Sequence, residues 1–345
     1  GKNAVASAAL KLLADKAETE NLPLVVLDQT HDFAEEHRPD RVWAWREATR
    51  FTRGADLAAW ELPTGNNIVH AALTARDRER LIGTGIDSRD VFVLPNSVAE
   101  RTELPPSECA KVREKLDEGR PYLLAAQKVM RRKNTLELLL LAAALRRQGL
   151  DYGLVVTLAG SSAADREFEQ LVVLAADSLK LPSVIGVSRT LGADAPPFEH
   201  VLAGSSALVT ASVMEGFGMG FLEGWLAGRP VLGRWLEGPC ADFYSAGVQL
   251  DHLYRSMLVD PSWIDGGLER LAAEYRQRID SLRRRLDHPA YEDEEFRREF
   301  VRYKVAKDHD GRRLVDFGDL SAAMQSELLH RTDDGVLDEI LELNP

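Results

Sequence analysis

The chain has 345 residues, 45% of them hydrophobic and 28% charged, which is typical of a globular protein of about two domains. The formal net charge of −12 argues against a nucleic-acid partner and against electrostatic docking on an anionic membrane. The longest largely apolar run, residues 136–145, is too short to span a membrane, and the two cysteines, Cys109 and Cys240, lack the spacing of metal ligands or of a disulfide framework. A protein of the reducing cytoplasm is therefore expected.

The first hundred residues alternate between helical and strand-like patterns, in the order of a βαβαβ unit with one helix before it. Such an order favours a parallel sheet. His31 lies in a polar cluster directly after the first expected strand, at the sheet edge where open α/β proteins bind ligands, although a lone histidine is more often structural. Strands are predicted at residues 22–27, 68–71 and 90–94, and helices at residues 4–19, 41–53 and 74–82.

A second alternating series follows a linker with a short helix, predicted at residues 101–120. This series favours a five-stranded, doubly wound domain over residues 121–260. No strand is predicted beyond residue 250, and residues 261–345 are expected to form a helical extension, beginning with one long helix at 263–287, that packs on the rest of the chain or mediates a homodimer. Strands are predicted at residues 122–126, 154–159, 184–187, 207–212 and 231–232, and helices at residues 134–148, 165–179, 196–204 and 221–227.

A glycine-rich turn joins the fourth strand of this second series to the next helix. Glycines at 216, 218 and 220 allow a ligand to approach the backbone, and the free N–H groups at the start of the helix suit a diphosphate. Glu215 and Glu223 frame the turn, with seven residues between them, and a carboxylate readily accepts hydrogen bonds from vicinal hydroxyls. The combination predicts a nucleotide-sugar site, while the plainer alternative is a tight turn with two solvated glutamates.

A basic loop, residues 127–134, lies between the first strand of the second series and its helix. Lys128 and Lys133 belong to it, together with two arginines. Cations at this sheet edge would neutralise a diphosphate and stabilise the charge on a departing nucleoside diphosphate. The alternative is an ordinary solvated loop.

Residues 211–233 resemble the E-x7-E motif of the retaining GT-B glycosyltransferases of family 4, including the Gly-x-Pro-Val that follows it at 228–231. Lys128 and Lys133 have the spacing of the Arg-x4-Lys pair of that family, with lysine where arginine is usual. Pro95-Asn96-Ser97-Val98 resembles the Pro-Asn-Gly-Val at the end of the first domain, where Asn96 would be a structural residue on the hinge side. The resemblance implies two Rossmann-like domains facing a cleft, with residues 1–100 as a partial acceptor-side domain.

The same resemblance implies transfer of a hexose from a UDP, GDP or ADP sugar to a hydroxyl of a small soluble or saccharide acceptor, with retention of configuration. The donor would be a substrate, and neither a cofactor nor a metal is implied. Glu215 would contact the donor sugar, Glu223 the ribose, and His31 would line the cleft and orient the donor. Lys128, Lys133, Gly216, Phe217 and Gly218 would hold the diphosphate, and Val187 would lie near the nucleobase.

The first domain departs from the family, because the opening strand and glycine-rich loop are absent before residue 22. Either a segment precedes Gly1, or the chain is a shortened relative, whether active or inactive. Two other functions therefore remain open, a nucleotide-sugar-binding protein with impaired catalysis and a GT-B epimerase. The order of elements alone also allows other two-domain Rossmann-like enzymes.

Overall fold

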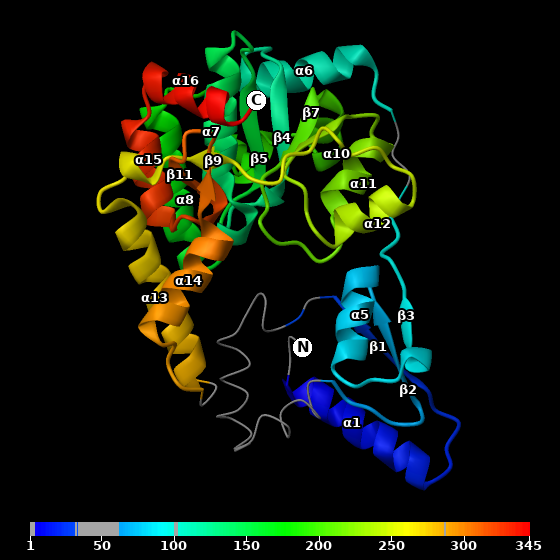
Figure 1. Cartoon of the computed structure of the whole chain (residues 1–345). Coiled ribbons are helices and arrows are strands. Elements are labelled where there is room, and N and C mark those ends of the chain that lie inside the picture. Colours follow the sequence, from blue (N-terminus) through cyan, green and yellow to red (C-terminus); the bar gives the residue numbers. More distant parts are fainter. Residues whose placement is uncertain (1–3, 32, 34–61, 100–102, 286–287) are drawn as a thin grey trace.

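The computed structural model describes residues 4–31, 33, 62–99, 103–285 and 288–345 (Figure 1). The chain has a mixed α/β fold, with a smaller and a larger Rossmann-like unit, each built on a parallel sheet. The predicted helix at residues 41–53 lies outside the described residues. No helix in the described part of the chain is long and apolar enough to cross a membrane.

The smaller unit has a three-stranded parallel sheet in the order β1-β2-β3. Its first strand begins four residues later than predicted, because the ladder with β2 opens at Val26, whose N–H donates to the Asn67 carbonyl oxygen. His31 directly follows this strand. Its elements are α1 (Ala4–Thr19), β1 (Val26–Thr30), β2 (Ile68–Ala72), α5 (Ala75–Gly83), η1 (Ser88–Asp90) and β3 (Val91–Val93).

The larger unit has a five-stranded parallel sheet in the order β6-β5-β4-β7-β8, which confirms the predicted doubly wound fold. The order reverses between β4 and β7, so the carboxyl ends of these two strands flank the crevice where such sheets bind ligands. The strands are β4 (Tyr122–Lys128), β5 (Gly153–Leu158), β6 (Ser183–Ile185), β7 (Ala207–Thr210) and β8 (Val231–Gly233). The helices are α6 (Pro106–Asp117), η2 (Arg131–Lys133), α7 (Thr135–Arg147), α8 (Ala163–Ser178), α9 (Val187–Leu191), η3 (Gly192–Asp194), α10 (Phe198–Gly204), α11 (Met219–Leu226) and α12 (Pro239–Ser245).

The C-terminal extension packs on the larger unit. Figure 1 shows α15 and α16 beside α7 and α8, and these helices contact one another directly. Helix α7 is therefore covered on both sides, by the sheet and by the extension, and Leu136, Leu138 and Leu139 are completely or almost completely buried. The described elements of the extension are η4 (Pro261–Trp263), α13 (Gly267–Arg285), α14 (Asp293–Lys304), η5 (Phe317–Asp319), α15 (Ala322–Arg331) and α16 (Asp334–Leu343).

Strands also occur beyond residue 250, so the expectation of none there is wrong. The strands β9 (Leu258–Val259), β10 (Ala306–Lys307) and β11 (Arg313–Asp316) form a small antiparallel sheet. Strands of two to four residues are too short to show a period of two, which explains why the sequence pattern missed them. The long helix begins at Gly267 rather than at residue 263, since Asp260 accepts a hydrogen bond from the Ser262 N–H at 2.8 Å and holds a 3-10 turn there.

Candidate functional site

The glycine-rich turn after β7 leads directly into α11. Gly218 precedes the first helical residue and has a φ of +80°, which favours glycine. A Cβ atom there would also lie 2.9 Å from the Cβ of Pro239, so the turn has no room for a side chain. The first turn of α11 thereby becomes part of a cavity wall.

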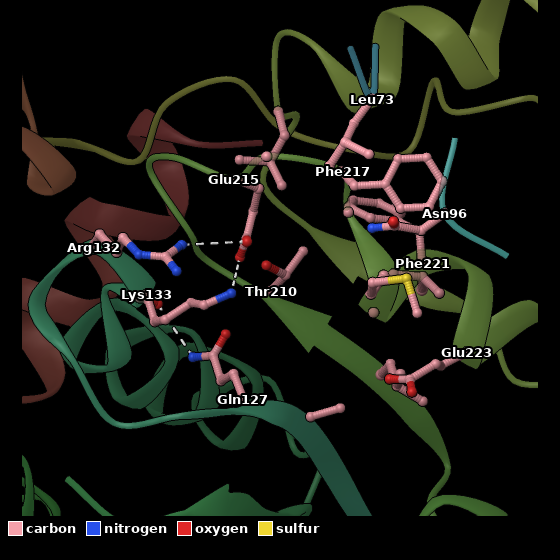
Figure 2. Close-up of a pocket in the computed structure, with 18 of the residues that line it drawn as sticks. Leu73, Asn96, Gln127, Arg132, Lys133, Thr210, Glu215, Phe217, Phe221 and Glu223 are labelled. Atoms are coloured by element: carbon pink, nitrogen blue, oxygen red, sulfur yellow. Dashed lines mark hydrogen bonds and ion pairs between the residues drawn. The ribbon is translucent and has the colours of Figure 1, made fainter. Parts of the chain in front are cut away.

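This cavity has a volume of about 340 Å³ and lies at the carboxyl ends of β4 and β7. Both units contribute to it, with His31, Leu73 and Asn96 from the smaller unit. The larger unit contributes the basic loop, the end of β7, the glycine-rich turn and α11 (Figure 2). Near the cavity the units are linked by a hydrogen bond from the Ala75 N–H to the Asp242 carboxylate at 2.9 Å.

Glu215 is the centre of the polar contacts in the cavity. Its carboxylate forms an ion pair with the Lys133 ammonium and accepts a hydrogen bond from the Ser212 hydroxyl at 2.8 Å. The Arg132 guanidinium lies 3.4 Å from its second oxygen. Figure 2 shows Arg132 and Lys133 converging on Glu215 from the basic loop. The turn and the loop are also joined through their backbones, because the Val213 N–H donates to the Arg132 carbonyl oxygen at 3.0 Å.

The pKa of Glu215 is lower than its ordinary value of 4.5. Burial is the largest influence and acts to raise the pKa, but the charge of Lys133 and the hydrogen bonds from Lys133 and Ser212 together outweigh it. Glu215 is therefore a carboxylate at neutral pH. It can accept hydrogen bonds from hydroxyl groups but cannot serve as a proton donor.

Glu223 lies in the second turn of α11, away from Glu215. Figure 2 shows the two glutamates at separate ends of the drawn wall, with Phe217 and Phe221 labelled between them. Phe221 is buried and packs against the Trp225 ring, with ring centroids 5.7 Å apart. A ligand that offers hydroxyls at two ends could therefore engage both carboxylates.

The structure brings most of the predicted site residues to one cavity. The cavity is lined by His31, Lys133, Glu215, Gly216, Phe217, Gly218 and Glu223. His31 is exposed and follows the end of β1, on the wall that the smaller unit provides.

Lys128 and Val187 are the two predicted site residues that do not line this cavity. The Lys128 ammonium donates to the Ser161 hydroxyl at 2.9 Å and lies 3.3 Å from the Asp165 carboxylate, on the side of the β5–α8 loop. Val187 begins α9 and is buried in the core of the larger unit. Their contact with a nucleotide stays a prediction.

Several lining residues were not predicted as part of the site. Asn96, which the sequence suggested as a hinge residue, lines the cavity together with Gln127 and Thr210, and Arg132 lines it as one of the two arginines of the predicted basic loop. Gln127 donates from its side-chain amide to the Lys133 carbonyl oxygen at 3.2 Å and so links the start of the basic loop to Lys133. A usable signal was present for these four, because each follows or ends a strand at the carboxyl edge of a sheet.

Comparison with solved structures identifies the fold class. The chain superposes on Anabaena HepE in its complex with UDP-glucose with a TM-score of 0.50 and 14% identity, covering 98% of this chain and 76% of that chain. The HepE complex with UDP gives a TM-score of 0.51 and 16% identity, covering 72% of this chain and 63% of that chain. At these identities the likeness shows a GT-B fold and nothing finer.

Comparison of sequences adds one relative. The chain is 28% identical over 247 residues to mannosylglucosyl-3-phosphoglycerate synthase of Petrotoga mobilis. The match covers 69% of this chain and 45% of the synthase, so the chain spans about half the length of that protein. No protein-family model matches the chain.

Proposed function

We propose that the chain transfers a hexose from a nucleoside-diphosphate sugar to a hydroxyl of a small soluble or saccharide acceptor, with retention of the anomeric configuration. The observation that carries the proposal is the Lys133–Glu215 ion pair beside the first turn of α11, inside a cavity that both units line. A cation and the N-terminus of a helix bind a diphosphate, and an ionised carboxylate next to them binds sugar hydroxyls. Nucleotide sugars have this layout of groups.

The donor would lie across the cavity from Glu223 to Glu215. Glu223 would accept hydrogen bonds from the ribose, and the start of α11 with Lys133 would bind the diphosphate. Glu215 would then accept hydrogen bonds from the sugar, while His31 and Asn96 would face it from the smaller unit. Both faces of the donor would thus be enclosed by protein, which excludes water from the reacting carbon.

The transfer would occur on one face of the sugar. The bond between the anomeric carbon and the leaving phosphate oxygen breaks, and the acceptor oxygen bonds to the same face of that carbon. The acceptor proton passes to the departing phosphate oxygen. Lys133 and the α11 N–H groups stabilise the negative charge that develops on the leaving diphosphate. A double displacement would need a free carboxylate nucleophile, whereas Glu215 is engaged by Lys133, Ser212 and Arg132.

The choice of donor can be narrowed by the comparisons. HepE was crystallised with UDP-glucose, and the name of the Petrotoga mobilis synthase describes a product with a mannosyl group on glucosyl-3-phosphoglycerate. Glucosyl and mannosyl donors, and glucosylated acceptors with a phosphoglycerate group, therefore belong first in a screen.

The test measures release of the nucleoside diphosphate from UDP, GDP and ADP sugars, with and without acceptors, followed by NMR of the new anomeric centre. We expect acceptor-dependent release from at least one donor and a product of unchanged anomeric configuration. Glu215→Ala and Lys133→Ala should abolish it. Donor binding without release in the presence of any acceptor would instead support a binding protein without transfer activity.

A further inference from the structure

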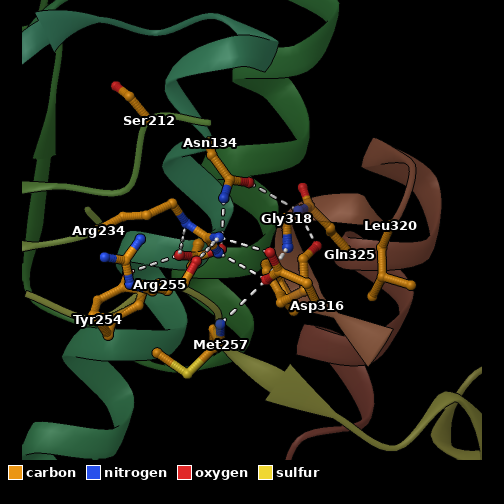
Figure 3. Close-up of polar contacts among 12 residues, drawn as sticks. Asn134, Ser212, Arg234, Tyr254, Arg255, Met257, Asp316, Gly318, Leu320 and Gln325 are labelled. Atoms are coloured by element: carbon orange, nitrogen blue, oxygen red, sulfur yellow. Dashed lines mark hydrogen bonds and ion pairs between the residues drawn. The ribbon is translucent and has the colours of Figure 1, made fainter. Parts of the chain in front are cut away.

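A buried polar network connects the C-terminal extension to the basic loop. Its centre is Glu137 in the first turn of α7, whose side chain is completely buried. The carboxylate accepts hydrogen bonds from the Arg234 guanidinium at 2.6 and 3.0 Å, from the Tyr254 hydroxyl at 2.7 Å and from the Asn134 amide at 2.6 Å. Arg234 also binds Asp316 at the end of β11 through two contacts of 2.7 and 2.8 Å. Figure 3 shows Asn134, Arg234 and Asp316 meeting between α7 and the extension.

Asn134 connects this network to Lys133, the cation on which the proposed donor site depends. It directly follows Lys133 and has a left-handed backbone, with a φ of +54°. Its amide nitrogen donates to Glu137, and its amide oxygen accepts a hydrogen bond from Gln325 of α15 at 2.8 Å. Gln325 is completely buried and also donates to the Phe317 carbonyl oxygen at 2.7 Å. Both ends of the Asn134 side chain are therefore held.

The start of the η2 turn, at Arg131, is held by the same segment of the extension. The Arg131 guanidinium donates to the Leu320 carbonyl oxygen and lies 3.4 Å from the Gly318 carbonyl oxygen. Arg132 and Lys133 lie between Arg131 and Asn134. The two cations that converge on Glu215 therefore project from a turn whose two ends are both attached to residues 317–325.

A purely structural role does not account for these residue types. Apolar side chains of similar volume stabilise a protein interior as well as a buried ionic network does, or better. The polar groups are instead those that fix the backbone of the turn, because a left-handed asparagine needs its local hydrogen bonds to stay in that conformation. The network also reaches the far wall of the cavity, since the Arg234 N–H donates to the Thr210 carbonyl oxygen at 2.8 Å.

We propose that Asn134 and Gln325 are positioning residues, through which the C-terminal extension orients Lys133 toward the diphosphate of the donor. This proposal rests on the proposed function, because it assigns a role to the same cavity. A lysine bears its charge on a flexible stem, so the position of its backbone decides whether the ammonium reaches a bound anion. A cation that contacts the ligand directly but is not held in position binds the ligand more weakly and stabilises the transition state less.

The test uses two variants of the full chain. Gln325→Met keeps the length of the side chain but removes the donor to Asn134. Asn134→Gly keeps the left-handed backbone and removes the side chain. We expect each to weaken binding of the best ligand among UDP, GDP and ADP by up to about 100-fold in titration calorimetry. Binding of the parent nucleoside, measured by NMR titration, should not change, because the nucleoside does not contact Lys133.

A matched control tests whether weakening the attachment of the extension at a distant point also lowers the affinity for the diphosphate. Arg147→Ala removes the Arg147–Asp338 contacts of 2.7 and 2.8 Å, which attach α16 to the other end of α7. We expect this variant to bind the diphosphate like the wild type, even if its melting temperature falls. In a double-mutant cycle, Gln325→Met and Asn134→Gly should lose less together than the sum of their separate losses.

Three results would overturn the proposal. One is wild-type diphosphate affinity in folded Gln325→Met and Asn134→Gly. Another is an equal loss of affinity for the parent nucleoside, and the third is an equal loss in Arg147→Ala. If Gln325→Met does not fold, Asn134→Gly decides the question by itself. Failure of the wild type to bind any nucleoside diphosphate would refute the proposed function instead, and this outcome is distinguishable because it appears before any variant is made.

Discussion

Replacing Lys133 with methionine tests the contribution of its charge to two quantities, the affinity for a diphosphate and the free energy of unfolding. The substitution keeps most of the side-chain volume and removes the charge. Glu215 would retain the Ser212 hydroxyl at 2.8 Å and the Arg132 guanidinium at 3.4 Å as partners. Because burial already acts to raise the pKa of Glu215, loss of the Lys133 charge should raise that pKa.

The structure sets the size of both effects. Breaking a buried ion pair costs about 3–5 kcal/mol, but each side chain here keeps 16% exposure and Arg132 remains nearby, so we expect a loss of about 1–3 kcal/mol in the free energy of unfolding. A bound diphosphate would lose one charge-assisted hydrogen bond, which is worth about 1.5–3 kcal/mol. Its affinity should therefore fall about 10- to 150-fold.

The double variant Lys133→Met with Glu215→Gln distinguishes the two effects. Without the charge on Glu215 no carboxylate is left unpaired, so the melting temperature should recover most of its loss. The diphosphate affinity should stay low, since the cation is still missing. Thermal unfolding and titration calorimetry with UDP, GDP and ADP measure the two quantities on the same samples. Recovery of affinity in the double variant, or no loss in Lys133→Met, would refute the reasoning.

Four further variants test other parts of the cavity and the ionisation of Glu215. In the wild type, a nucleoside diphosphate should bind about tenfold more tightly than its 2′,3′-dideoxy analogue, and Glu223→Ala should remove this difference in dissociation constant. An unchanged difference in the variant would exclude Glu223 from the ribose site. Gly218→Ala should destabilise the chain by about 1–3 kcal/mol, because of its φ of +80° and the 2.9 Å approach to Pro239. Gly220→Ala should keep or raise the melting temperature and yet weaken ligand binding, since an added Cβ meets nothing within 4 Å and Gly220 lines the cavity. For Glu215, whose pKa is lowered in the folded chain, the stabilising contribution is present above about pH 4.5 and is lost as the pH falls below it. The difference in melting temperature between the wild type and Glu215→Gln should therefore shrink below that pH, and a constant difference from pH 7 to pH 4 would contradict the assignment.

The larger sheet was predictable because its strands are apolar runs, well separated by amphipathic helices. The turn from Glu215 to Glu223 was equally accessible, since its glycines, its helix start and its second carboxylate all lie within nine consecutive residues. Local chemistry of this kind depends little on distant parts of the chain. The small sheet of β9, β10 and β11 was missed because each strand forms through pairing with its neighbours and has no alternating pattern of apolar and polar residues of its own.

The contacts between distant residues could not be predicted. Lys128 has the expected spacing from Lys133, but its ammonium is engaged by Asp165 in the first turn of α8, which follows another strand. Gln325 lies far along the chain from Asn134, and nothing in the local pattern around either residue indicates their hydrogen bond. Asn96, which was expected on the hinge side, reaches the cavity only through the arrangement of the two units. Such contacts depend on tertiary packing and leave no periodic signal in the sequence.

The most direct test of the central claim is titration calorimetry of the chain with UDP, GDP and ADP, in parallel with Lys133→Met. We expect saturable binding of at least one nucleoside diphosphate to the wild type, with one site per chain, and affinity at least about tenfold lower in the variant. Absence of binding by all three, or equal binding to both proteins, would contradict a nucleotide-sugar site built around Lys133 and Glu215.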